Sequence, residues 1–239
     1  DMSYAFLVIV ATFFVIKGVT KNKINYLQLF LILFLLLASR PSSIPVIFSI
    51  IFFIVISKHK FFLKSKNILL FVLLIFISTP FIYGLAYLFM EYNVNSKSFD
   101  EVAYQDFIYK YVKNGMIIHG RPETWVESPN TYLDVVYIYF LRIVNFFNPY
   151  ASTFSILHII LNTFQIFIVL LSIFVWSLLE NNNKFQNKIY FFIIILSFFV
   201  AAFHSFILID YDWRYRFPII LPMIMLFPMS LNIIFKKKN

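Results

Sequence analysis

Residues 153–179 read TFSILHIILNTFQIFIVLLSIFVWSLL, a run that contains no Asp, Glu, Lys or Arg. About 20 consecutive apolar residues are enough for a helix to cross the hydrocarbon core of a bilayer, and this run is longer. Inside a bilayer each segment must satisfy its own backbone hydrogen bonds, which a helix does and an isolated strand does not. The stretch therefore predicts a transmembrane α-helix in an integral membrane protein.

The composition of the whole chain agrees with this prediction. Of its 239 residues, 61% are hydrophobic and 13% are charged, whereas soluble domains are roughly half apolar and a quarter charged. The chain has no Cys and only four Gly, which excludes disulfides, thiolate metal sites and glycine-rich phosphate loops. The four His are scattered, so we expect neither a metal site nor a cofactor.

Further apolar runs predict an all-α, multi-pass membrane protein with about seven transmembrane helices. The predicted spans are Met2–Ile16, Tyr26–Ala38, Ile44–Ser57, Asn67–Met90, Thr153–Leu179, Ile189–Leu208 and Pro218–Phe235. The first three are short and are expected to borrow flanking residues. Residues 1–90 thus hold transmembrane helices 1–4, and residues 153–239 hold transmembrane helices 5–7 with a lysine-rich cytoplasmic tail.

The segment between these two groups is predicted to stay outside the bilayer core. Residues 91–131 are polar and form a predicted extracytoplasmic loop. Residues 132–147 are apolar but amphipathic, because their polar side chains and Thr131 share an arc of about 60–80° in a helical projection. The polar members of that arc are Thr131, Asp134, Arg142 and Asn145. Such a helix is expected to lie in the outer interface without crossing it.

The positive-inside rule orients these spans. One face of the predicted topology receives 12 Lys and one acid, and the other receives eight basic residues and ten acids. The lysine-rich face is therefore predicted to be cytoplasmic, with the C-terminus on that side of a plasma (inner) membrane. The net charge of +9 then reflects orientation, and the expected partner is the lipid bilayer and not nucleic acid.

All five Arg lie on the predicted outer face. A planar guanidinium donates paired hydrogen bonds to phosphate or carboxylate, which Lys cannot match. Pro41 is expected to end a helix just after Arg40, and Arg214 and Arg216 lead into the last predicted span. These three arginines are the candidate site for a lipid phosphate. The alternative is that they only snorkel to the interface or pair with nearby acids.

One predicted span carries a polar stripe. Its members, Ser155, His158, Asn162 and Gln165, recur at spacings of three and four residues and so share one helix face. Lipid cannot satisfy such groups, so they must face other helices or a wet cavity. His204 in the next span permits the same two interpretations, which are packing between helices and lining of a substrate cavity.

Two motifs resemble bacterial GT-C glycosyltransferases, in the group that includes protein mannosyltransferases and lipid A aminoarabinose transferases. The Arg40-Pro41-Ser42 hairpin and the short span after it are similar to the middle of these enzymes. Their C-terminal end is similar to His204 and the stretch Arg214-Tyr215-Arg216-Phe217-Pro218-Ile219-Ile220-Leu221-Pro222. The resemblance implies transfer of a sugar from a polyprenyl-phosphate donor to an extracytoplasmic acceptor, with the outer Arg holding the donor phosphate.

The resemblance has one departure. The family's catalytic Asp lies in a first external loop that has no counterpart here, so we expect the chain to be the C-terminal half of such an enzyme and assign no catalytic residue. Two alternatives stay open. One is an O-antigen-type polymerase or ligase, which also combines outer Arg with polyprenyl pyrophosphate. The other is a non-enzymatic transporter or membrane subunit, for which charged or Gly/Pro-broken segments at mid-membrane are expected.

Overall fold

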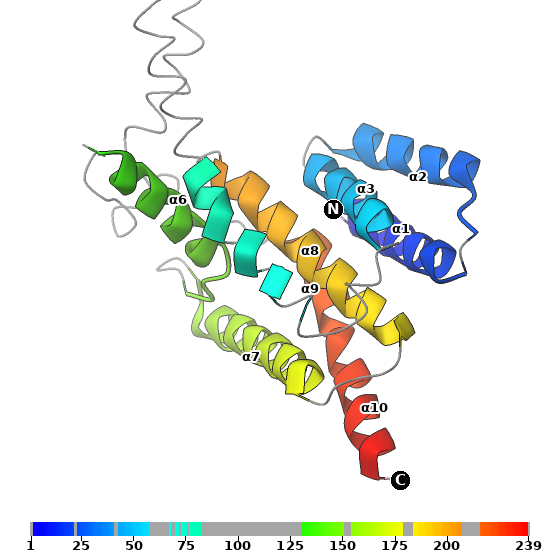
Figure 1. Cartoon of the computed structure of the whole chain (residues 1–239). Coiled ribbons are helices and arrows are strands. Elements are labelled where there is room, and N and C mark those ends of the chain that lie inside the picture. Colours follow the sequence, from blue (N-terminus) through cyan, green and yellow to red (C-terminus); the bar gives the residue numbers. More distant parts are fainter. Residues whose placement is uncertain are drawn as a thin grey trace, which may run out of the picture. The chain divides into compact units, whose positions relative to one another are not determined.

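The computed structural model describes residues 2–21, 23–40, 43–57, 67, 70–71, 73–75, 77–82, 131–150, 154–178, 184–206 and 216–238. Its helices are α1 (Met2–Thr20), α2 (Tyr26–Ser39), α3 (Ile44–Ile56), α6 (Tyr132–Phe146), α7 (Ile156–Leu178), α8 (Lys184–Phe206), α9 (Phe217–Ile224) and α10 (Leu226–Lys238) (Figure 1). Within these residues there is no β-strand, so the predicted all-α class is confirmed.

Among the described residues, three helices are long and apolar enough to cross a membrane, judged by length and composition, and they indicate a membrane protein. They are Ser3–Thr20, Ile156–Leu178 and Phe185–Ser205. Helices α2 and α3 have 14 and 13 residues, a length of about 20 Å against a hydrocarbon core of about 30 Å. The count of seven spans therefore stays a prediction.

The last predicted span is divided in the structure. Helix α9 ends at Ile224 and α10 begins at Leu226, with Met225 between them. Pro228 has no N–H to donate to the carbonyl of Ile224, and its ring crowds that carbonyl. The predicted Pro218–Phe235 span is therefore two helices joined at a proline-dependent break.

The predicted span Asn67–Met90 is described only in part, and its residues 77–82 are helical. The predicted loop 91–131 lies outside the described residues except for Thr131. This residue begins α6, where its side chain accepts from the Asp134 N–H and the Asp134 carboxylate accepts from the Thr131 N–H at 2.8 Å. This capping box satisfies two N–H groups at the start of the helix.

Contacts divide the chain into two compact units, which we describe separately. The first comprises Asp1–Leu73, Pro149–Val200 and Trp213–Asn239, and the second comprises Leu74–Asn148 and Ala201–Asp212. In the first unit α1 packs against α2, α3 and α9, and α7 packs against α9 and α10. Phe53 on α3 fills part of this core, with its ring 5.8 Å from that of Phe191 and 5.0 Å from that of Phe192 on α8.

Candidate functional site

Arg40 lies at the end of a helix, as predicted. Helix α2 stops at Ser39, and Arg40 has an extended backbone (φ −160°, ψ 142°) because the residue before a proline disfavours the helical region. The Arg40 carbonyl accepts from the Ser43 N–H at 3.0 Å and from the Ser43 hydroxyl at 2.7 Å. These bonds fix the backbone of Arg40, a half-buried residue, at the C-terminal end of α2.

Arg216 also lies at a helix end. It is the N-cap of α9, and its carbonyl accepts from the N–H groups of Ile219 at 3.0 Å and Ile220 at 3.1 Å. A helix N-terminus and a guanidinium both favour an anion. Arg40 and Arg216 belong to the same compact unit. Arg214 lies outside the described residues.

The polar stripe on α7 forms mostly local hydrogen bonds. The Ser155 hydroxyl lies 2.9 Å from Nδ1 of His158 and accepts from the His158 N–H at 3.4 Å, in the manner of a helix cap. The Asn162 amide donates to the Pro149 carbonyl at 3.4 Å. Asn162 and Gln165 are half-buried, whereas His158 is exposed. These contacts hold the first turns of α7, and none of the four stripe residues lines the cavity described below.

His204 lies in the second unit and is 8% exposed. Its ring is parallel to that of Phe146 on α6, with centroids 5.7 Å apart and an interplanar angle of 9°. Two other α6 residues reach carbonyls near the end of α8. Tyr139 donates from its hydroxyl to Ala202 at 3.0 Å, and Arg142 donates from Nη1 to Ser205 at 3.4 Å. These contacts support the packing interpretation for His204.

Arg142 is far more buried than Thr131, the residue that begins the polar arc of α6. Thr131 is exposed, whereas Arg142 is only 3% exposed. The last carbonyls of a helix lack partners within the helix and carry the negative end of its dipole, so a buried guanidinium there is electrostatically favourable. Arg142 thus helps to hold α6 against the end of α8, which the sequence pattern did not indicate.

A buried polar cluster joins α7, α8 and α10 in the first unit. The Trp176 indole N–H donates to the Asn187 side-chain oxygen at 2.8 Å, and the Trp176 ring stacks on Tyr190 at 4.8 Å and 3°. The Tyr190 hydroxyl bonds to the Ser230 hydroxyl and lies 3.1 Å from the Leu226 carbonyl. Ser230 in turn lies 3.2 Å from the Ser172 carbonyl of α7.

Two hydroxyl protons serve this cluster. The Tyr190 hydroxyl donates across helices, to the Ser230 oxygen or the Leu226 carbonyl of α10. The Ser230 hydroxyl lies 2.9 Å from the Leu226 carbonyl of its own helix and 3.2 Å from the Ser172 carbonyl of α7. Trp176, Tyr190 and Ser172 are fully buried, so these groups have no competing water. We interpret the cluster as the polar contact that specifies how α7, α8 and α10 pack. The sequence analysis missed it, although polar residues in apolar helices are the signal that marks such contacts.

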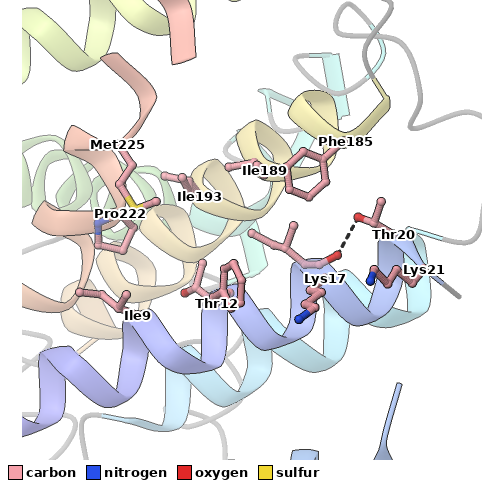
Figure 2. A pocket seen from close by; sticks show the side chains of 12 residues that line it. Ile9, Thr12, Lys17, Thr20, Lys21, Phe185, Ile189, Ile193, Pro222 and Met225 are labelled. Carbon is pink, nitrogen blue, oxygen red and sulfur yellow. Dashed lines mark hydrogen bonds between the residues drawn. The ribbon is translucent and has the colours of Figure 1, made fainter. Parts of the chain in front are cut away.

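A cavity of about 430 Å³ lies in the first unit between α1, α8 and the α9–α10 segment (Figure 2). Its base is formed by buried residues and its rim by more exposed ones. The base residues are Thr12, Ile16, Ile193 and Pro222, and the rim includes Phe13, Phe185 and Met225. The remaining lining residues are Ile9, Lys17, Thr20, Lys21 and Ile189.

The wall of this cavity is apolar although two threonines contribute to it. Thr12 donates its hydroxyl to the Val8 carbonyl at 2.7 Å. Thr20 donates to the Ile16 carbonyl at 2.7 Å, the bond that is dashed in Figure 2. Both hydroxyl protons are therefore used within α1. Lys17 and Lys21 lie one helical turn apart at one end, where their carbon stems line the cavity and their ammonium groups supply positive charge beside it. The cavity is thus an apolar trough with a cationic end.

A third lysine lies close to that end. Lys188 of α8 donates from Nζ to the Val19 carbonyl of α1 at 3.3 Å. The C-terminal end of α1 and the N-terminal end of α8 therefore meet. Among the residues that the structure describes, Asp134 is the only acid, and it caps α6 in the second unit.

No group of three or more His, Cys, Asp or Glu that could hold a metal ion occurs in the described part of the chain. No family model, curated protein or solved structure matches this chain. The observations above define it as an α-helical protein whose described part holds three helices long and apolar enough to cross a membrane.

Proposed function

We propose that this protein is a membrane glycosyltransferase, or the C-terminal portion of one, that transfers a sugar from a polyprenyl-phosphate donor to an acceptor on the extracytoplasmic side. The observation that carries the proposal is the placement of Arg40 and Arg216. Each lies at a helix end within one compact unit, and each is half-buried. Half-buried arginine residues at helix ends suit recognition of a lipid phosphate.

The proposed topology has about seven spans, with the lysine-rich face in the cytoplasm and the C-terminus on that side. The hydrogen bond from Lys188 to Val19 supports it, because it brings together lysine-bearing ends of α1 and α8 that the positive-inside rule assigns to one face. Helix α2 follows α1 after a short connection at that end, so its far end, with Arg40, falls on the opposite face. The arginines are then extracytoplasmic.

The proposed reaction is a displacement at the anomeric carbon. An acceptor hydroxyl oxygen forms the new bond to that carbon, and the bond from the carbon to the phosphate oxygen breaks. The phosphate leaves with the electron pair as polyprenyl phosphate, and the hydroxyl proton passes to a general base. Because the leaving phosphate gains negative charge as the bond breaks, Arg40, Arg214 and Arg216 would stabilise the transition state electrostatically.

The proposal is tested with the full chain in liposomes and two panels of donors, polyprenyl-phosphate sugars and polyprenyl-pyrophosphate saccharides, with membrane extract as the acceptor source. A photoreactive polyprenyl-phosphate sugar measures donor binding, and chromatography of the lipid products measures turnover. We expect crosslinking to the chain, and release of polyprenyl monophosphate where the catalytic loop is present. Release of polyprenyl pyrophosphate would favour the polymerase or ligase alternative. A chain that neither crosslinks nor turns over any donor contradicts the proposal.

The topology makes a separate prediction that uses the absence of native Cys. Single-cysteine variants Ser65→Cys, Ser128→Cys and Asn182→Cys are labelled in intact cells with a membrane-impermeant maleimide. We expect Ser128→Cys to react from outside, and the other two to react only after permeabilisation. Labelling of Ser65→Cys from outside would overturn the orientation. Labelling of both Ser128→Cys and Asn182→Cys from outside, without labelling of Ser65→Cys, would show that residues 132–147 cross the membrane.

A further inference from the structure

We infer that the trough between α1, α8 and the α9–α10 segment binds one anionic phospholipid, with an acyl chain along its apolar wall and the phosphate at Lys17 and Lys21. This site is separate from the proposed donor site at Arg40 and Arg216. The inference rests on the cavity and on the positive charge beside it. It does not depend on Arg40, Arg214 or Arg216.

The dimensions of the trough fit one lipid chain. Its volume of about 430 Å³ lies within the roughly 300–1,000 Å³ that is usual for small-molecule sites. Along α1 the lining runs from Ile9 to Lys21, which at about 1.5 Å per residue is about 18 Å. One leaflet of a hydrocarbon core about 30 Å thick is about 15 Å deep. The trough is therefore as long as a single leaflet, with its cationic end at the headgroup level.

The wall of the trough has the chemistry of an acyl-chain site. Thr12 is 7% exposed and Ile193 is 1% exposed at its base, whereas Phe185 and Met225 at the rim are 42% and 50% exposed. The base is buried and the rim is exposed. The trough is therefore a groove that an acyl chain can enter from the side. Because the threonine hydroxyls donate within α1, no polar group of the wall requires a polar ligand.

The cationic end distinguishes an anionic lipid from a neutral one. The ammonium group of Lys17 lies 5.6 Å from the centre of the Phe13 ring, which places the charge over the rim of the trough. Lys21 is one turn further along α1, and Lys188 lies at the same end of the helix pair. Two lysines that line the cavity complement a phosphodiester, and a zwitterionic headgroup would leave its own ammonium group beside them.

The test measures lipid binding to the full chain purified in detergent, by native mass spectrometry. The probes are phosphatidylglycerol, phosphatidylcholine with identical acyl chains, and glycerol phosphate without chains. We expect tighter binding of phosphatidylglycerol than of phosphatidylcholine and no binding of glycerol phosphate. Lys17→Gln combined with Lys21→Gln should weaken phosphatidylglycerol binding about 30-fold, at roughly fivefold per lysine, and leave phosphatidylcholine unchanged.

Variants that fill the trough test whether it binds the acyl chain of the lipid. Ile9→Trp and Met225→Trp each place a large ring in the trough from opposite sides, and each should abolish binding of both lipids. The matched control is Phe6→Trp, at a position on α1 that is 65% exposed and outside the cavity lining. The charge control is Lys236→Gln combined with Lys237→Gln. Helix content from circular dichroism shows that each variant is folded.

Three results would overturn the inference. Equal binding of phosphatidylglycerol and phosphatidylcholine by the wild-type chain would show that the lysines select nothing. Binding of glycerol phosphate as tight as that of phosphatidylglycerol would show a phosphate site without a lipid chain. Unchanged lipid binding in both folded tryptophan variants would show that the acyl chain of the lipid binds elsewhere on the protein.

Discussion

Arg216→Lys is expected to lower sugar transfer at least about 100-fold while leaving the protein inserted and abundant. Arg216 is the N-cap of α9, and its backbone carbonyl, not its guanidinium, holds the first turn of that helix. A lysine keeps the positive charge and the backbone bonds but loses the paired N–H donors. Removing one preorganised donor to a developing oxyanion costs about 10²–10³ in turnover. The measurement is release of polyprenyl phosphate in liposomes by protein that carries the catalytic loop.

The matched control for this prediction is Arg121→Lys, which removes another guanidinium of the predicted outer face without touching the three proposed ligands. It should retain turnover close to that of the wild-type chain. Arg40→Lys should reduce turnover in the same direction as Arg216→Lys, because the two residues are proposed to hold one phosphate. Wild-type turnover in Arg216→Lys would contradict the proposal that this guanidinium holds the leaving phosphate.

Trp176→Ala is expected to lower the free energy of unfolding by about 3 kcal/mol. The ring is fully buried, stacks on Tyr190 at 4.8 Å and donates to Asn187. Removing a large aromatic side chain from a soluble core costs about 3–5 kcal/mol. We place this variant at the lower end because lipid is itself apolar, so the loss comes from packing and the cavity, with little hydrophobic transfer. Equilibrium unfolding in mixed micelles, followed by circular dichroism, measures it.

Two variants separate packing from hydrogen bonding in this cluster. Tyr190→Phe removes only the hydroxyl that bonds to Ser230. Hydrogen bonds between membrane helices average about 0.6 kcal/mol, with a maximum near 1.7, so the loss of stability in this variant should fall in that range. Phe174→Ala, also on α7 but 58% exposed, should change stability by about 0.5 kcal/mol or less. A cost for Phe174→Ala equal to that of Trp176→Ala would show that the cluster has no special role.

The candidate site was predictable where the signal is local. The stop of α2 before Arg40-Pro41 follows from the restricted backbone of a residue that precedes proline, and the structure has it there. The end of α9 and the burial of Arg142 were not predicted. The first also has a local signal, Pro228, which lies four residues after Ile224 and which the predicted single span did not take into account. The second depends on the carbonyls at the end of α8, which lie 63 residues away in sequence.

The sequence by itself determined the helical class and the membrane setting of this protein. Both follow from the length of apolar runs and from the backbone hydrogen bonds that a bilayer requires, which are properties of each segment alone. Only the tertiary structure decided which polar residues meet, such as Tyr190 with Ser230, and where Lys17 and Lys21 border a cavity. A bilayer is apolar on every side of a helix, so apolarity does not indicate which face packs. That choice depends on side-chain packing and interhelical hydrogen bonds, which form only once the helices are assembled.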